Sequence, residues 1–188
     1  MENKLPKFES MKTKQIIRKA QQLTDPFRVD KGKNFHLKDI DPGDTLGYGD
    51  EAKPRAKEAL AMGIKLLAQL QDRLYANNKW ALLLIFQAMD AAGKDGAIKH
   101  VMSGVNPQGC QVSSFKAPSP EELDHDYLWR CLKVLPNRGH IGIFNRSYYE
   151  DVLVVRVHPE LLARQKIPPE LITKRIWRER FDDIGNWQ

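Results

Sequence analysis

The sequence has little of what marks secreted, disulfide-bonded or membrane proteins. Its 188 residues include only two cysteines, Cys110 and Cys131, too few for a disulfide framework or a cysteine-based zinc site. The first ten residues, MENKLPKFES, hold no apolar stretch of the kind found in secretory signals. No apolar run approaches the roughly 20 residues that span a bilayer. We therefore expect a cytoplasmic protein without a membrane segment.

Aromatic residues are scarce where the positive charge gathers. The formal net charge of +6 comes entirely from residues 1–38, which hold ten Lys or Arg and four Asp or Glu. Such an arm is typical of proteins that bind nucleic acid or another polyanion. Only Phe8, Phe27 and Phe35 accompany it, so stacking on bases is poorly supported. A solvated extension explains the charge at least as well, and we expect no nucleic-acid partner.

The first half of the chain predicts a loop-rich extension followed by a folded core. Residues 24–50 are rich in Asp, Gly and Pro, which favours loops. We interpret residues 1–50 as a basic, loop-rich N-terminal extension and residues 51–188 as the core. Helical apolar spacing covers residues 51–76, and the two asparagines at 77 and 78 should end that helix. The apolar run of residues 80–86 then suits a strand buried on both faces.

Beyond residue 90, predicted helices and strands alternate. We expect a helix over 94–102, a short strand within 110–115 and a second buried strand over 140–145. Ser119, Pro120 and Glu122 form a capping-box signature, which should start a helix that reaches residue 135. A last helix is expected from about residue 169 to the end. This alternation predicts an α/β fold, a parallel sheet flanked by helices on both faces.

Residues 87–100, QAMDAAGKDGAIKH, have the features of a loop that binds phosphate chains. Small residues let backbone N–H groups approach a ligand closely, and the helix that follows directs its partial positive charge at a bound anion. Lys94 adds a full positive charge. A purely structural turn is the alternative reading. The predicted phosphate-binding residues are Ala91, Ala92, Gly93, Lys94, Asp95, Gly96 and Lys99.

The loop departs from the common pattern G-x-x-x-x-G-K-[ST] at two positions. Ala88 replaces the first glycine, and Asp95 replaces the Ser or Thr whose hydroxyl usually binds magnesium. In addition, Asp90 places an acid inside the loop, where it requires a positive charge close by. These departures indicate a variant of the common loop.

A second set of polar residues follows the strand predicted over 140–145. Ligands of parallel sheets bind beyond the carboxyl ends of strands, so this set should lie near the loop. Phosphate-loop enzymes often place a magnesium-binding carboxylate here, but this chain has Asn145, with acids five and six residues later. Arg146 suits bidentate phosphate binding, and a surface salt bridge explains it equally well. Tyr148 and Tyr149 could stack on a base or pack in the core.

Taken together, these segments resemble the second family of polyphosphate kinases, the polyphosphate:nucleotide phosphotransferases. The resemblance is carried by residues 88–116, by residues 129–159 and by the ending FDDIGNWQ, and it spans roughly residues 25–188. It implies a P-loop-kinase-like fold and reversible, Mg²⁺-dependent phosphoryl transfer between inorganic polyphosphate and a nucleoside mono- or diphosphate. The asparagine followed by Tyr-Tyr-Glu-Asp resembles the subgroup that acts on both AMP and ADP.

The resemblance also implies roles for individual residues. Asp90 would contact the metal or the acceptor phosphate, while Lys94 and Arg146 would bind phosphate. These three are the predicted catalytic residues. We expect Asp90, Asn145 and Glu150 to hold Mg²⁺, with Glu150 supplying the carboxylate that Asn145 lacks. Six basic residues could form a track for a long polyanion, or be solvated surface charges: Lys99, Lys116, Arg130, Lys133, Arg138 and Arg156.

The predicted partners are inorganic polyphosphate and the adenine nucleotides AMP, ADP and ATP, and we expect a homo-oligomer. Family members continue past the final tryptophan with another strand, an arginine-bearing lid and further helices, so we expect this chain to lack the lid. Two other functions stay open. One is a nucleoside monophosphate kinase that uses ATP as donor, and the other is an anion-binding fragment without turnover.

Overall fold

The computed structural model describes residues 12–188, which divide into two compact units, one running to Gln69 and the other from Leu70 to Gln188. The described part of the first unit opens with helix α1 (Thr13–Thr24), in a region that we expected to be loop-rich. The backbone N–H of Lys12 donates to the Gln15 side chain at the start of α1, and Ile16 is buried. The proposed division into residues 1–50 and 51–188 stays a prediction.

Loops follow α1, as the Asp, Gly and Pro content predicts. Carboxylates cap local turns: Asp41 accepts from the Gly43 N–H at 2.8 Å, and Asp44 accepts from the Leu46 N–H at 2.7 Å. The short 3₁₀ turns of this region are η1 (Asp25–Phe27), η2 (Gly32–Asn34), η3 (Leu37–Asp39) and η4 (Asp50–Ala52).

Helix α2 (Lys53–Asn77) confirms the long helix predicted from the apolar spacing. Its end also agrees with the prediction, because Asn78 adopts a φ of 49°. Asparagine tolerates this left-handed conformation better than most residues, and its N–H still bonds the carbonyl of Leu74 at 3.1 Å. The chain can therefore leave the helix and enter the first strand.

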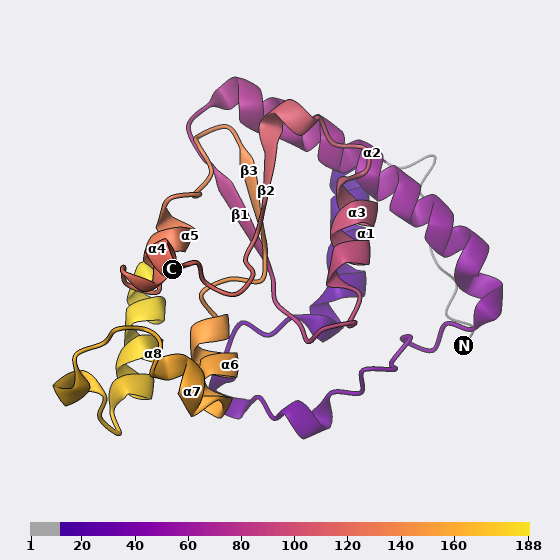
Figure 1. Ribbon diagram of the computed structural model, residues 1–188. Helices are drawn as coiled ribbons and strands as arrows, with labels where there is room; N and C mark the ends of the chain where they lie inside the picture. The colour runs from indigo at the N-terminus through magenta and orange to yellow at the C-terminus, as the bar shows by residue number, and fades with distance from the viewer. Residues whose placement is uncertain (1–11) are drawn as a thin grey trace. The chain divides into compact units, whose positions relative to one another are not determined.

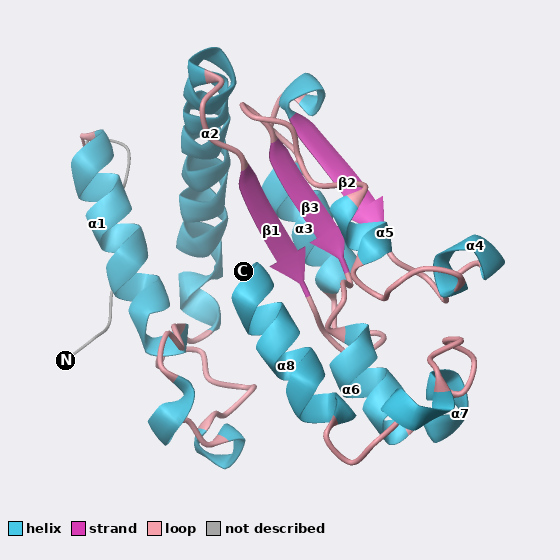
Figure 2. Cartoon of the chain, turned by 90° about the vertical axis from the view of Figure 1, so that its left-hand side faces the viewer, coloured by secondary structure: helices cyan, strands magenta, loops and turns pink. Residues whose placement is uncertain are grey.

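The second unit contains a three-stranded parallel sheet in the order β1-β3-β2, which confirms the predicted α/β class. The strands are β1 (Leu82–Phe86), β2 (Cys110–Ser114) and β3 (Ile141–Asn145). Figure 2 shows β3 between its neighbours, with all three arrowheads at the same end of the sheet. In this register Phe86 and Ser114 both lie opposite Asn145. The loops after all three strands therefore meet at one edge of the sheet.

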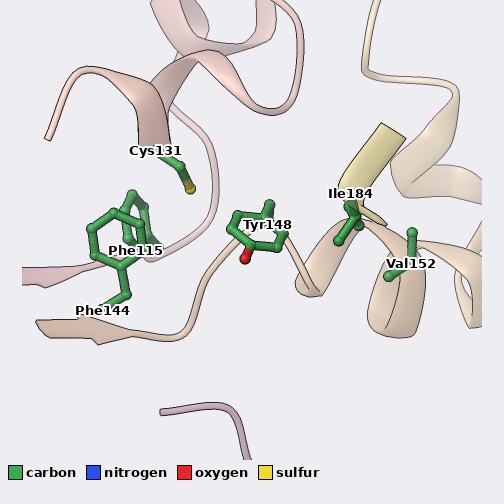
Figure 3. Close-up of a cluster of buried hydrophobic side chains, with 6 residues drawn as sticks. All are labelled: Phe115, Cys131, Phe144, Tyr148, Val152 and Ile184. Atoms are coloured by element: carbon green, nitrogen blue, oxygen red, sulfur yellow. The ribbon is translucent and has the colours of Figure 1, made fainter. Parts of the chain in front are cut away.

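Helices cover both faces of the sheet, as predicted. On one face, Ile141 and Ile143 of β3 pack with Ile98 and Met102 of α3 (Lys94–Met102) and with Leu74 of α2. On the other face lies a cluster that Figure 3 shows in close-up, with Tyr148 between the paired phenylalanine rings and the two aliphatic side chains. Its buried members are Phe115, Cys131, Phe144, Tyr148, Val152 and Ile184. Figure 1 shows α3 on one side of the strands and α5 with α8 on the other.

The packing of this second cluster decides the role of Tyr148, which the sequence left open. The rings of Phe115 and Phe144 meet edge to face at 4.9 Å between centroids, a favourable aromatic geometry. Tyr148 is fully buried and packs edge-on against Trp187, so this tyrosine belongs to the core. Cys131 is a free thiol, and burial raises its pKa to about 11.

Of the two strands expected to be buried, β3 is buried and β1 is not. Every residue of β3 before Asn145 is buried, whereas β1 is half-buried and Leu82 is exposed. Trp80, which we placed in the strand, precedes it and is 75% exposed. The reason is position: β1 is an outer strand of the three, with a neighbour on one side only. An apolar run alone does not distinguish an outer strand from a central one.

Two helix predictions are wrong in extent. The capping box at Ser119 is present, with the Glu122 N–H donating to Ser119 Oγ at 3.2 Å, but α4 (Pro120–Leu123) is short and α5 (Trp129–Leu132) is separate. The carboxylate of Asp126 accepts from the Leu128 N–H and starts a new turn. The last helix, α8, spans Ile176–Trp187, and only the 3₁₀ turn η6 (Pro169–Leu171) forms where we expected its start.

The remaining elements are α6 (Glu150–Val157), α7 (Pro159–Leu162) and the 3₁₀ turn η5 (Pro107–Gly109). A buried network joins α6 to α8. The Arg180 guanidinium donates to the Asp151 carbonyl at 2.9 Å and to the side chain of Gln165, which donates in turn to the Asp151 carboxylate. Burial raises the pKa of Asp151 and lowers that of Arg180. Within residues 12–188, no helix is both long and apolar enough to cross a membrane.

Candidate active site

The loop between β1 and α3 is left-handed at two positions and leads directly into a helix. Ala91 and Gly93 have positive φ values of 64° and 88°, a conformation that glycine adopts without steric cost. Gly93 is the N-cap of α3, and its carbonyl accepts the first helical bond from the Ala97 N–H at 2.9 Å. Lys94 therefore occupies the first turn of a nine-residue helix, beside the positive end of the helix dipole.

The acid inside this loop is paired with two cations. Lys94 Nζ lies 3.5 Å from Asp90 Oδ1, and the Arg146 guanidinium bonds the same oxygen. The Asp90 carboxylate is 80% exposed, whereas the side chain of Lys94 is only 8% exposed. The positive charges that Asp90 requires thus come from its own loop and from the residue that follows β3. All three predicted catalytic residues lie together.

The sheet register explains how Arg146 reaches the loop. Its backbone N–H donates to the Phe86 carbonyl at 3.0 Å, one residue beyond the last strand pair. Arg146 also has a positive φ of 65°, which is uncommon for a residue with a side chain. Its second guanidinium nitrogen lies 3.8 Å from Glu150 Oε2. Arg146 therefore bridges the loop acid and the first residue of α6.

Two polar residues near this bridge were not identified from the sequence. Gln87 Nε2 donates to Glu150 Oε1 at 2.5 Å, and Ser147 Oγ donates to Gln87 Oε1 at 3.2 Å. These bonds hold Glu150 beside Arg146. The signal was available in principle, since the parallel pairing of residues 86 and 145 places Gln87 next to the residues that follow β3.

The end of β3 contacts α3 through a second polar pair. The Asn145 side-chain amide donates to Asp95 Oδ1. Its oxygen, Oδ1, is buried and has no hydrogen-bond partner among the described residues. A buried acceptor without a partner costs about 1–3 kcal/mol, so a cation or a donor that reached this oxygen would be stabilised.

Two neighbouring cavities contain these groups. The first, of about 470 Å³, is lined by the polar residues Asp90, Lys94, Asp95, Asn145, Arg146 and Lys116, together with Phe115 and the short residues Ala91, Ser114 and Ala117. The second, of about 250 Å³, shares Arg146 and Lys116 with the first. Its wall combines apolar side chains with further charges: Phe115, Leu123, Val154, Arg130, Arg164 and Glu150.

Several predicted residues do not line the first cavity. Of the predicted phosphate-binding residues, Ala91, Lys94 and Asp95 line it, whereas Ala92, Gly93, Gly96 and Lys99 do not. Among the six basic residues proposed as a polyanion track, only Lys116 and Arg130 line either cavity. Arg130 is largely buried and donates to the Lys116 carbonyl at 2.9 Å, so part of its role is structural.

The oxygen atoms of the first cavity suit a hard cation. Asp90, Asp95 and Asn145 line it, and the buried Oδ1 of Asn145 has no hydrogen-bond partner among the described residues. Mg²⁺ prefers carboxylate and carbonyl oxygens with several waters retained. Among residues 12–188, no three His, Cys, Asp or Glu side chains already gather as a metal site. Glu150, the third predicted ligand, lines the second cavity and is bonded to Gln87.

The fold and the site define a class. The first strand of the parallel sheet leads through a small-residue loop into a helix that begins with Gly-Lys, and an arginine follows the central strand. This is the arrangement of P-loop-type kinases. The Polyphosphate kinase 2 (PPK2) family model matches residues 50–168. The chain belongs to this family.

Individual relatives and one solved structure agree with this assignment. The ADP-polyphosphate phosphotransferase of Rhodopseudomonas palustris is 52% identical over 87% of this chain and 56% of its own length. The AMP/ADP-polyphosphate phosphotransferase of Meiothermus ruber is 43% identical over 86% and 56%, respectively. The crystal structure of polyphosphate kinase 2 from Arthrobacter aurescens is similar with a TM-score of 0.75 and 40% identity, covering 88% of this chain and 55% of that one. The chain thus spans a little over half the length of these relatives.

Proposed function

We propose that this chain carries the phosphoryl-transfer site of a Mg²⁺-dependent phosphotransferase that moves phosphoryl groups between inorganic polyphosphate and AMP or ADP. The observation that carries the proposal is the convergence of Asp90, Lys94 and Arg146 on one cavity. The names of the R. palustris and M. ruber relatives support the choice of substrates.

Phosphoryl transfer requires positioning and charge neutralisation more than covalent chemistry. In the proposed mechanism Lys94 binds a phosphoryl oxygen beside the N-terminus of α3, where the helix dipole adds to its charge. Arg146 exchanges its bond to Asp90 for the equatorial oxygens of the transferred group and stabilises the charge there. Its second contact, to Glu150, keeps the guanidinium in the shared wall of both cavities.

The Asp90 carboxylate is 80% exposed and therefore open to a metal, and bound phosphates would also draw Lys94 and Arg146 away from it. Asp90 and Asn145 Oδ1 would hold Mg²⁺, with Glu150 of the predicted set acting through Arg146. When bound, the cation neutralises charge on the phosphate oxygens.

We assign the acceptor nucleotide to the second cavity and the polyphosphate donor to the first. The second cavity has the apolar wall that a base requires, and the first has the more polar lining. Arg146 and Lys116 line both, so a phosphoryl group that passes between the cavities stays in contact with cations. A homo-oligomer and a cytoplasmic location stay predictions.

The choice of donor tests the proposal against the two alternatives. Two reactions are run on this chain and on a form of the relatives' length. The first contains AMP or ADP, polyphosphate and Mg²⁺, and the second contains ATP as the phosphoryl donor in place of polyphosphate. The proposal predicts ADP or ATP formation from polyphosphate without added ATP. Product from ATP and AMP alone would establish a nucleoside monophosphate kinase instead. Anion binding without turnover in both forms would establish a binding function.

A further inference from the structure

The pair formed by Asp95 and Asn145 has a geometry that a simple surface contact does not explain. Asn145 is the last residue of the central strand, and its backbone is fixed on both sides. Its carbonyl accepts from the Phe115 N–H at 3.0 Å, and the next N–H donates to Phe86 at 3.0 Å. The point from which the Asn145 side chain projects is therefore fixed by the sheet.

Asp95 determines which way that amide points. A carboxylate accepts hydrogen bonds and cannot donate them when ionised, so only the Nδ2 end of Asn145 can face it favourably. The bond from Nδ2 to Asp95 Oδ1 then leaves Asn145 Oδ1 on the other side, buried and without a partner among the described residues. Reversing the amide would place two oxygens against each other.

We propose that Asp95 is a positioning residue that fixes the Asn145 amide with its oxygen directed to the cation of the transfer site. Asp95 occupies the position at which the common phosphate loop has its magnesium-binding Ser or Thr. In this chain Asp95 and Asn145 share the task of binding the cation. Asn145 supplies a neutral oxygen, and Asp95 holds it in place. The inference rests on the proposed function, because Asn145 has a metal to bind only there.

A structural role for Asp95 makes a different prediction. As an acid in the first turn of α3, Asp95 also interacts with the helix dipole, which contributes about 0.3–1 kcal/mol to stability. Loss of that interaction alone would lower the melting temperature and leave metal affinity unchanged. Glu179, in the first turn of α8 and exposed, provides a matched control for removal of a first-turn charge.

The test is Mn²⁺ binding, measured by electron paramagnetic resonance on the chain without substrates. The variants are Asp95→Asn, Asn145→Asp, the exchange Asp95→Asn/Asn145→Asp, and Glu179→Gln. We expect Asp95→Asn to weaken Mn²⁺ binding by about 10–100-fold, the range for loss of an outer-shell partner, because its amide no longer selects one orientation of Asn145. The exchange variant restores the pair with the roles reversed, so its affinity should return at least to the wild-type value. Glu179→Gln should bind as wild type.

Unchanged Mn²⁺ affinity in Asp95→Asn would overturn the inference, as would an exchange variant that binds no better than Asp95→Asn. Absence of Mn²⁺ binding by the wild-type chain would overturn it as well. The proposed function is decided separately by product formation from polyphosphate. Transfer together with an Asp95→Asn variant of normal Mn²⁺ affinity would remove the positioning role alone.

Discussion

The positive φ of Arg146 gives a prediction that separates the residue's chemistry from its backbone strain. Replacement by alanine or by glycine removes the guanidinium equally, so both variants lose the bonds to Asp90 and Glu150. Only glycine also relieves the left-handed conformation, at a φ of 65°. The two variants should therefore lose activity to the same extent and differ in stability.

The expected difference in folding stability between the glycine and alanine variants follows from two opposing effects. A left-handed residue with a Cβ costs about 1–2 kcal/mol, and glycine loses about 0.4–1 kcal/mol through the greater freedom of its unfolded chain. The difference leaves Arg146→Gly more stable than Arg146→Ala by roughly 1 kcal/mol, or about 2–4 °C in melting temperature for a chain of this size. Urea unfolding followed by circular dichroism measures it.

Arg178 supplies the control, since it is exposed within α8. There glycine should be less stable than alanine by about 0.8–1.0 kcal/mol, the reverse of the order at 146. An alanine variant at 146 as stable as the glycine variant would refute the reasoning. In a form of the protein that catalyses phosphoryl transfer, both Arg146 variants should lose about 10–150-fold in kcat/KM. This range corresponds to the loss of one hydrogen bond to a charged group, which is worth about 1.5–3 kcal/mol.

Three further predictions concern the loop, the buried acid and a helix cap. Lys94→Met should weaken binding of inorganic triphosphate about tenfold or more, since it removes a charge-assisted bond worth about 1.5–3 kcal/mol; calorimetry measures this, and equal affinity contradicts the phosphate role. Burial raises the pKa of Asp151, so the folded state holds this proton more tightly than the unfolded state. The contribution of this bound proton to folding stability is complete below the pKa of an ordinary aspartate. It is lost as the pH rises through the pKa of Asp151 in the folded state. Asp151→Asn should therefore gain stability relative to wild type as the pH increases from about 4, and a difference independent of pH would be evidence against burial of the ionised acid. Ser119→Ala should lose about 0.5–2 kcal/mol in urea unfolding, because Ser119 and Glu122 cap each other; no loss would show that the cap is replaced by water.

The sequence was sufficient to predict the fold class and the convergence of the two polar segments. Parallel strands present their carboxyl ends at one edge, so Asp90 and Arg146 could be placed near each other without coordinates. The positions of Asn78 and of the first residues of α3 also followed from local rules, because asparagine and glycine accept left-handed backbone. Local chemistry was informative where one residue decides the conformation.

The errors arose where tertiary context decides. The outer position of β1 depends on the order of the strands, which the apolar run does not contain. The division of the helix after Ser119 depends on Asp126, whose carboxylate competes with helical hydrogen bonds. The bonds from Gln87 to Glu150 and from Asn145 to Asp95 join residues 63 and 50 positions apart, a pairing that depends on the register of β1 against β3.

The most direct test of the account is Asp90→Asn in a form of the relatives' length, supplied with ADP, polyphosphate and Mg²⁺ and assayed for ATP with luciferase. The account predicts ATP formation by the wild type without added ATP. It predicts that Asp90→Asn loses more than the 10–100-fold typical of an outer-shell change, because the variant removes a proposed metal ligand from the centre of the site. Undiminished ATP formation by the variant would remove Asp90 from the mechanism and contradict the account.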